Sequence, residues 1–360
     1  MGNNFKYMKV EEYILDYIQQ KSLVEGDKLP TGNELIQLLG VSKISIQRAM
    51  RDLVEKKAVY QIRGGGSYVG PLFPKEKAIT YVPLILSHGK KVTGGLDILS
   101  GVESFFKDKS YYITTHLTQK NPETERAVIN QLVNNGAKYI ISFPNSSEEN
   151  WRFYFDHMRN GVSFVFIDHK PQNISVNLVS SDNVEGGYLA TEHLIQQGYK
   201  RIGLVSMYPE NSSTTLTQRY LGYQIALKKY NMELSEDYIM FSCPEQFMNQ
   251  LSTMLSLTNA PDAIFAANDF AAIECLHYFK QNGIAVPNDM GIIGYDDLEI
   301  TYLEHPSISS VKQQFFEQGY QAAKMMYDII QGKHPFTETI SLPVQLMPKE
   351  SSLRQLVEKA

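Results

Sequence analysis

Cysteine is scarce in this 360-residue chain, which holds only Cys243 and Cys275, and two thiols make no disulfide framework. Its eight histidines show neither an HExxH motif nor clustering with cysteine, so we expect no metal site and no cofactor. No run reaches the ~18 apolar residues that a membrane span needs, and the N-terminus lacks a charged-then-apolar signal segment. We therefore predict a soluble, cytoplasmic protein that does not enter a membrane.

Signals of enzymatic chemistry are equally sparse. The run Gly64-Gly65-Gly66 lacks the Gly-Lys-Ser/Thr that completes a phosphate-binding loop. Asp296 and Asp297 are adjacent, so their side chains point in different directions and do not form the opposed carboxylate pair of a glycoside hydrolase. The sequence therefore predicts that the protein is not an enzyme.

A winged helix-turn-helix pattern stands near the N-terminus. Thr31 and Glu34 have the spacing of a capping box, which predicts a helix that begins near Gly32. Gly40 permits a sharp reversal, and Ser42 is suited to cap a second helix. The apolar face of the first of these helices carries Leu35, Leu38 and Leu39.

The second helix is expected to divide its side chains between the core and the outside. Its apolar residues at helical spacing are Ile46, Met50, Leu53 and Val54. Polar side chains that can reach phosphates and base edges then lie on the outer surface or its flanks: Lys43, Ser45, Gln47, Arg48 and Arg51. Two β-type runs, 59–63 and 67–69, follow, joined by three glycines that let the backbone press into a groove. The pattern over 30–69 predicts DNA binding, and a helical hairpin with a β-ribbon that packs on another surface is the alternative.

Charge is distributed unevenly along the chain. Residues 1–70, which we call the head, contain ten Lys+Arg and eight Asp+Glu, whereas the rest contains 24 and 31. The head is thus about +2 and the remainder about −7. A weakly basic head has modest, strongly salt-dependent affinity for DNA, so tight binding should require two heads on one operator. We therefore expect a homodimer on palindromic double-stranded DNA.

The remainder of the chain alternates strand-like and helix-like segments after a proline-containing linker. Such alternation is typical of parallel sheets covered by helices, and two doubly wound lobes leave a cleft at the carboxyl ends of their strands. The sequence therefore predicts an α/β protein in which a winged helix-turn-helix joins a two-lobed core of doubly wound parallel sheets. The expected boundaries are 1–70 for the head, 71–79 for the linker and 80–350 for the two-lobed core. Within the core, the first lobe is expected to span about 80–178 and 310–338. The second lobe is expected to span about 179–309 and 339–348.

The head resembles the GntR family of bacterial transcription factors in its Leu-Gly-Val-Ser, Ala-Met-Arg-Asp-Leu and Gly-Gly-Gly-Ser-Tyr-Val segments. This resemblance implies three kinds of DNA contact. Major-groove contacts fall on Lys43, Ser45 and Gln47; phosphate contacts on Ser42, Arg48 and Lys6; minor-groove contacts on Arg63, Gly64, Gly65 and Gly66. The family often has Arg at positions 43 and 47, and Gln47 favours adenine where Arg would favour guanine.

The core resembles the effector domain of the lactose and ribose repressor family, which is similar to periplasmic sugar-binding proteins. Segments that carry the resemblance include Ser181-Asp182-Asn183, Ala266-Ala267-Asn268-Asp269 and Gly294-Tyr295-Asp296-Asp297. A GntR-type head on such a core is similar to the arabinose-repressor branch of the GntR family. A polyol ligand needs a fork of donors, carboxylate acceptors and an amide, because its hydroxyls lose water in a closed cleft.

By the same resemblance, several residues are expected to contact an effector. They are Arg219, Asp296, Asn268, Asp168 and His169, with His88 and Lys90 from a loop at 87–95 and Phe241 against an apolar sugar face. Other roles are open for some positions. Asp168 is also suited to cap a turn and Asp297 to hold a hinge, Asp269 to cap the helix that begins at Phe270, and Trp151 to pack on a helix.

Together these patterns predict a ligand-controlled transcription factor. We expect a homodimeric repressor of carbohydrate-utilisation genes whose effector is a small sugar, a pentose or a deoxyhexose such as arabinose or fucose. Two alternatives stay open: a sugar-binding protein without a regulatory role, and a regulator that uses a phosphorylated sugar or a non-sugar effector as co-repressor.

Overall fold

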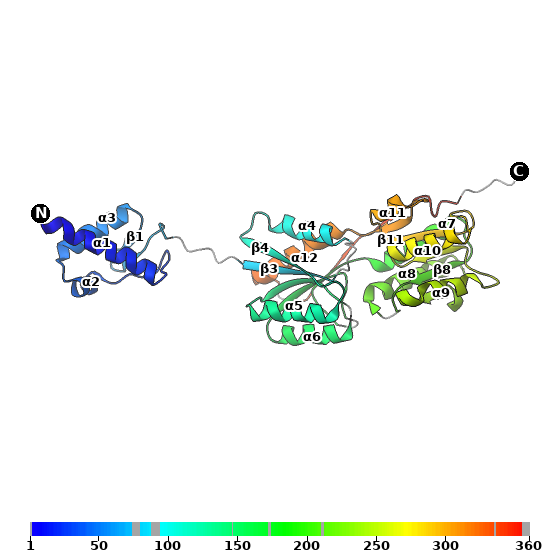
Figure 1. Ribbon diagram of the computed structural model, residues 1–360, viewed down its shortest axis with the longest axis horizontal. Coiled ribbons are helices and arrows are strands. Elements are labelled where there is room, and N and C mark those ends of the chain that lie inside the picture. Colours follow the sequence, from blue (N-terminus) through cyan, green and yellow to red (C-terminus); the bar gives the residue numbers. More distant parts are fainter. Residues whose placement is uncertain are drawn as a thin grey trace. The chain divides into compact units, whose positions relative to one another are not determined.

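The computed structural model describes residues 2–73, 80–87, 94–145, 147–171, 174–209, 212–334 and 336–354, with side chains from Tyr7 onward. The chain divides into two units, Met1–Thr80 and Tyr81–Ala360 (Figure 1). Each unit has its own hydrophobic core residues. None of the helices in the described ranges is long and apolar enough to cross a membrane.

The first unit is a winged helix-turn-helix. Its elements are α1 (Gly2–Gln20), α2 (Gly32–Leu39), α3 (Lys43–Glu55), β1 (Val59–Ile62) and β2 (Gly66–Val69), with the two strands antiparallel. The capping box is confirmed, because Glu34 N donates to Thr31 Oγ1 (3.3 Å) and Thr31 N donates to Glu34 Oε2 (2.6 Å). Gly40 ends α2 with a φ of 63°, and Ser42 caps α3 through Ser45 N. The predicted helices and hairpin are therefore present.

One hydrophobic core joins the elements of this unit, and it includes Val10, Ile14, Ile18, Leu35, Ile46, Met50, Leu53, Val59 and Val69. Leu38 and Val54, which we expected to face this core, are exposed instead. At 3.6 residues per turn, the core-facing stripe of α2 runs through Leu35, Ile36 and Leu39, and Leu38 lies about a sixth of a turn outside it. Val54 lies off the stripe of α3 for the same reason.

The second unit contains two six-stranded sheets, each covered by helices. The first lobe has strand order β13-β7-β6-β5-β3-β4. Its elements are β3 (Thr80–Leu86), α4 (Gly95–Phe106), β4 (Tyr111–Leu117), α5 (Pro122–Asn134), β5 (Tyr139–Phe143), α6 (Glu148–Arg159), β6 (Ser163–Ile167), β7 (Leu178–Ser181), α12 (Phe315–Ile330) and β13 (Thr339–Leu342). The pairs β3–β5, β5–β6, β6–β7 and β7–β13 are parallel.

The second lobe has strand order β14-β12-β11-β10-β8-β9. Its elements are α7 (Asn183–Gln196), β8 (Ile202–Ser206), α8 (Thr214–Lys229), a 3-10 turn (Glu236–Tyr238), β9 (Ile239–Phe241), α9 (Pro244–Leu255), β10 (Ala263–Ala266), α10 (Asp269–Gln281), β11 (Gly291–Asp296), α11 (Ile300–Leu303), β12 (Ser309–Lys312) and β14 (Gln345–Met347). Its strands pair in parallel except at β12–β14, which is antiparallel. The predicted α/β architecture is thus confirmed.

The chain passes between the lobes three times, after β7, after β12 and after β13. Each passage lies a few residues later than the boundary that we expected from the sequence. Residues 179–181 and 339–342 belong to the first-lobe sheet, and 310–312 belong to the second-lobe sheet. Apolar strands of both sheets look alike in sequence, so no local pattern marks where a strand changes its sheet.

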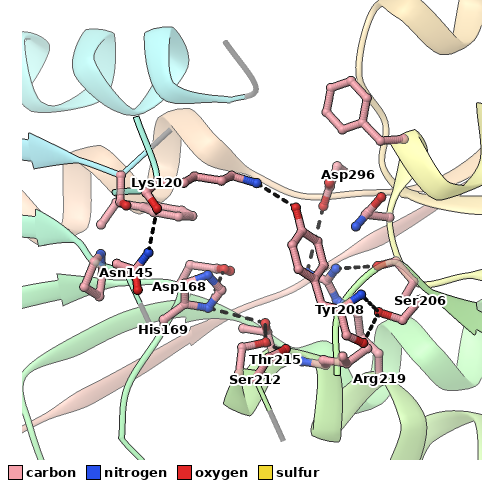
Figure 2. A pocket seen from close by; sticks show the side chains of 18 of the residues that line it. Lys120, Asn145, Asp168, His169, Ser206, Tyr208, Ser212, Thr215, Arg219 and Asp296 are labelled. Carbon is pink, nitrogen blue, oxygen red and sulfur yellow. Dashed lines mark hydrogen bonds and ion pairs between the residues drawn. The ribbon is translucent and has the colours of Figure 1, made fainter. Parts of the chain in front are cut away.

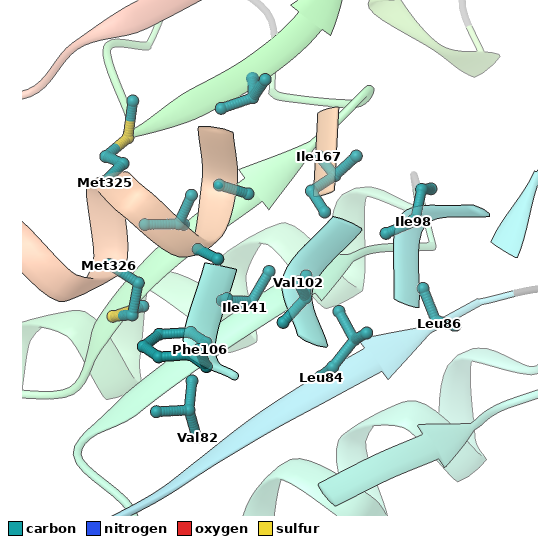
Figure 3. Close-up of a cluster of buried hydrophobic side chains, with 14 of the residues drawn as sticks. Val82, Leu84, Leu86, Ile98, Val102, Phe106, Ile141, Ile167, Met325 and Met326 are labelled. Carbon is teal, nitrogen blue, oxygen red and sulfur yellow. The ribbon is translucent and has the colours of Figure 1, made fainter. Parts of the chain in front are cut away.

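The core of the first lobe combines segments that lie far apart in the sequence (Figure 3). Val82 and Leu84 of β3 pack with Val102 of α4, and Met325 and Met326 of α12 close the same cluster. All five side chains are buried. The first lobe is therefore incomplete until the chain has returned to it through α12.

Candidate functional site

A cavity of about 410 Å³ lies between the two lobes (Figure 2). Its walls come largely from residues at or just after the carboxyl ends of parallel strands, which is where ligands bind in doubly wound folds. The first lobe contributes Ser87, Phe143, Asn145, Asp168 and His169, among others. The second lobe contributes Ser206, Tyr208, Thr215, Arg219, Asn268 and Asp296, and Gln313 and Phe315 follow β12.

Arg219 of α8 is buried and held along one side of its guanidinium. Nε donates to Asn183 Oδ1 (2.9 Å), Nη1 donates to Ala267 O (2.7 Å), and Cζ lies 3.6 Å from the centroid of the Tyr295 ring. Nη2 is 3.9 Å from Asp296 Oδ1, beyond the length of a hydrogen bond. The fixed guanidinium therefore keeps donor capacity at Nη2, in the wall of the cavity.

Asp296, at the end of β11, is oriented by two neighbours and by its backbone. Its φ is 113°, a conformation that residues with a Cβ rarely adopt. Oδ1 accepts a hydrogen bond from Gln313 Nε2 (2.7 Å). Burial raises the pKa of Asp296 to about 6, against the opposing effect of Arg219. Its carboxylate can accept hydrogen bonds from a ligand once it is ionised.

Asp168 presents a second carboxylate from the opposite lobe (Figure 2). It is buried, has a φ of 67°, and its Oδ2 lies 3.2 Å from His169 Nδ1. Oδ1 has no hydrogen-bond partner within the described part of the chain. Because an unpaired buried carboxylate oxygen is costly, this atom is a strong site for a ligand hydroxyl. Burial lowers the pKa of His169, so its ring is uncharged at neutral pH and can either donate or accept.

The affinity of the cavity for a hydroxyl-bearing ligand is expected to fall as the pH decreases through about 6, where Asp296 becomes protonated and loses acceptor capacity. The charged and polar groups that face it are Arg219, Gln313, Asp168 and Lys120. The stability of the ligand-free protein depends on pH in the opposite direction. The folded-state pKa of Asp296 is above the unfolded one, so the ionisation of this group lowers the stability as the pH rises. Isothermal titration between about pH 5 and about pH 8 measures the effect. Asp296→Asn should bind more weakly, with a flatter profile; a flat wild-type profile would place Asp296 outside the contact.

Lys120 and Tyr208 approach one another across the cavity, one from each lobe (Figure 2). Lys120 Nζ donates to Tyr208 Oη at 2.7 Å. No sequence pattern singles out this pair, nor Gln313, whose side chain bonds both Asp296 and Ser181 Oγ (2.8 Å). Each of the three lies in a loop or crossing segment, where no periodicity marks a residue as functional. Their positions next to strand ends are the one signal that was available.

Not every predicted effector residue lines this cavity. Phe241 is absent from the lining, and its ring packs edge-on against Tyr220, with 5.4 Å between centroids. Asn268 lines the cavity and also caps α10, because its Oδ1 accepts from Ala271 N (2.9 Å). His88 and Lys90 lie outside the described residues.

The capping role expected for Asp269 is wrong, since Asn268 occupies the cap position of α10. Asp269 is fully buried and accepts hydrogen bonds from Ser310 Oγ (2.6 Å) and Leu298 N (2.7 Å). Burial raises its pKa well above the ordinary value. Asp297 pairs with Lys349 Nζ at 2.6 Å and thereby attaches the segment after β14. Trp151 is buried on the inner face of α6.

The residues expected to contact DNA differ in exposure. Lys43, Gln47 and Arg63 are exposed, and the hairpin tip has positive φ at Gly64 (80°) and Gly66 (113°). Ser45, which we expected at the surface, is only 6% exposed because its Oγ lies 3.0 Å from Ser42 Oγ inside the helix cap.

Two phosphate contacts were also expected in the head. Arg48 lies over the ring of Tyr7, with 4.1 Å between Cζ and the centroid, and the Lys6 side chain falls outside the described residues. Over the described ranges, no group of three or more His, Cys, Asp and Glu is arranged to hold a metal ion.

Comparisons with known proteins match both units. Residues 6–69 match the bacterial regulatory proteins of the gntR family, and residues 191–352 match the periplasmic binding protein-like domain. A probable HTH-type transcriptional regulator EndR of Paenibacillus polymyxa is 26% identical over 332 residues, which cover 88% of this chain and 96% of that protein. An arabinose metabolism transcriptional repressor of Geobacillus stearothermophilus is 23% identical over 335 residues, 91% of each chain.

Solved structures of regulators share the fold. The transcriptional regulator CelR in complex with cellobiose has a TM-score of 0.68 at 22% identity, covering 86% of this chain and 91% of that one. The transcription regulator CcpA of Lactococcus lactis has a TM-score of 0.69 at 20% identity, covering 76% and 99%.

Fold, site and relatives together define this chain as a DNA-binding transcriptional regulator. We expected a protein that is not an enzyme, and its relatives are regulators rather than enzymes. Its N-terminal unit carries a domain that matches the gntR family of bacterial regulatory proteins, and its larger unit carries a periplasmic binding protein-like domain.

Proposed function

We propose that this protein represses carbohydrate-utilisation genes and that a sugar in the cavity between the lobes controls its affinity for the operator. The observation that carries the proposal is the donor and acceptor set in the cavity. Arg219 offers a fixed Nη2 donor, and Asp168 Oδ1 is a buried acceptor that lacks a partner in the described chain. A polyol satisfies both groups, because each hydroxyl donates and accepts. The names of the relatives, arabinose metabolism repressors among them, support the same class of effector.

Two classes of sugar, which differ in size, are candidates for the effector at this site. The first candidate is the pentose or deoxyhexose expected from the resemblance, and relatives named for arabinose metabolism favour it. The second is a sugar of two rings, which the size of the cavity allows. Its volume of about 410 Å³ falls within the range of small-molecule sites, about 300–1,000 Å³, so it does not restrict the effector to a single sugar ring. Tyr208 and Phe270 add ring faces to this cavity, against which the apolar side of a further sugar ring can pack.

The three segments that connect the lobes would let the lobes close on a ligand, and this closure would control operator binding. A sugar that contacts Asp168 in one lobe and Arg219 in the other favours the closed arrangement, since both contacts exist only when the lobes are together. In a homodimer on a palindromic operator, closure of the lobes alters the spacing of the two heads. For the protein to release the operator, the sugar must bind the arrangement that does not bind DNA more tightly, by a few kcal/mol, than the arrangement that does.

The proposal is tested by thermal stabilisation of the full-length protein with free pentoses, hexoses, deoxyhexoses, disaccharides and sugar phosphates. A ligand that binds the folded state alone raises the melting temperature with its occupancy. We expect one neutral sugar to stabilise the wild type and to release it from operator DNA. A pentose or deoxyhexose would establish the first candidate, and a disaccharide the second.

The matched variants are Asp168→Asn and Lys228→Gln. Asp168→Asn should lose the stabilisation, whereas Lys228→Gln, at an exposed position of α8, should keep it. Stabilisation by phosphorylated sugars alone, or by none of the panel, would contradict a neutral-sugar effector and leave the DNA-binding assignment intact.

A further inference from the structure

Ile44 is the second residue of α3 and is 73% exposed, more than any other large apolar side chain of α3 in the described structure. It does not share the face of α3 that packs in the core, which runs through Ile46, Met50 and Leu53. Water contact at a β-branched apolar side chain gives a helix neither packing nor good propensity. The side chain is therefore available for a contact outside the head.

The positions that share a face with Ile44 are polar. Gln47, Arg48 and Arg51 follow it by three, four and seven residues, which is the spacing of one helical face, and all three are exposed. Lys43 precedes it at the start of the helix and is exposed as well. In helix-turn-helix proteins, residues in the N-terminal part of the second helix contact base edges in the major groove. Ile44 is thus the apolar member of the surface that faces DNA.

Phosphates and hydrogen-bonding base edges offer nothing to an isoleucine. The apolar group in the major groove is the C5-methyl of thymine, and aliphatic side chains discriminate thymine through it. We propose that Ile44 is a specificity-determining residue that packs on the methyl group of one thymine in each half-site of the operator. The proposal rests on the placement of α3 in the major groove.

The same geometry limits where this thymine lies. Gln47 is one helical turn from Ile44, and glutamine pairs with adenine through its two hydrogen-bonding groups. A turn advances the helix by about 5.4 Å, and neighbouring base pairs are about 3.4 Å apart. The thymine that contacts Ile44 therefore lies within about two base pairs of the base that contacts Gln47.

Deoxyuridine tests this proposal, because it differs from thymidine by the C5-methyl group alone. Operators are first recovered by selecting randomised duplexes with the full-length wild-type protein. Each thymine of the selected operator is then replaced singly by deoxyuridine, and affinity is measured at fixed salt. We expect one thymine per half-site at which replacement weakens binding about fourfold, the equivalent of one apolar carbon removed from contact.

Ile44→Ala should bind the thymine and deoxyuridine operators equally at that position, and it should fold normally because alanine favours helix. Leu38→Ala, at an apolar residue of α2 that is 62% exposed, is the matched control and should keep the wild-type dependence on the methyl group. The proposal is overturned if no thymine shows a methyl effect that disappears in Ile44→Ala. In that outcome selection of an operator would still support DNA binding, whereas failure to select any operator would overturn both.

Discussion

Replacing Arg219 by alanine is expected to abolish the effector response while operator affinity in the absence of sugar stays within about twofold of wild type. The guanidinium is the donor that the second lobe presents beside Asp296, and it is held there by Asn183 and Ala267. Hydrogen bonds that involve a charged group contribute about 1.5–3 kcal/mol each. Loss of two such bonds to a sugar should therefore weaken its binding by at least about 100-fold.

The measurement is operator release as a function of sugar concentration, with sugar binding followed separately by calorimetry. Lys228→Ala removes a positive charge from an exposed position of the same helix and serves as the control. Arg219→Lys retains the charge but not the planar fork, so it should also respond poorly. Operator release by Arg219→Ala at the wild-type sugar concentration would remove Arg219 from the site.

Replacing Lys43 by alanine is expected to lower operator affinity by about 30-fold or more, with sugar affinity preserved. Lys43 is exposed at the first turn of α3, where side chains reach the groove. A good base contact contributes about 1–3 kcal/mol, and the proposed homodimer would lose it at both half-sites. The larger unit has cores of its own, so sugar binding should not change.

Fluorescence anisotropy with operator DNA at several salt concentrations measures this effect and identifies the contact. A lost phosphate contact weakens binding to all sequences and reduces the salt dependence by about one ion per head, whereas a lost base contact relaxes specificity. Lys21→Ala, which removes the same charge from the exposed residue that follows α1, is the control. Equal losses in both variants would indicate a general effect of charge and would count against a specific role for Lys43.

The parts of the head that the sequence predicted well are those fixed by local chemistry. Thr31 and Glu34 form their capping box within four residues of chain, and Gly40 reverses the backbone by its own conformational freedom. Ser45 illustrates the limit of such reasoning. Its hydroxyl was free to face solvent or the cap of its own helix, and the short contact with Ser42 places it in the cap.

The effector site was only partly accessible to sequence reasoning. Arg219, Asp168 and Asp296 carry recognisable neighbours in the sequence, and the structure brings them to one cavity. Gln313 lies where the chain leaves one sheet for the other, and the choice of sheet depends on strand pairing between distant segments. Asn268 and Asp269 both had the chemistry of a cap, and the buried partners of Asp269 decided between them. Such outcomes follow from tertiary packing, which a single sequence does not display.

The assembly of the first lobe from separate stretches of chain also sets the order of events during synthesis. The head has all its elements once residue 73 has emerged, but the first-lobe sheet lacks β13 until residue 342. At about 5–20 residues per second, these two moments are separated by roughly 13–54 seconds. During that interval a nascent chain carries a DNA-binding domain whose larger unit is still incomplete. A chain terminated early would do so permanently, as a single weakly charged head without the unit that contains the cavity.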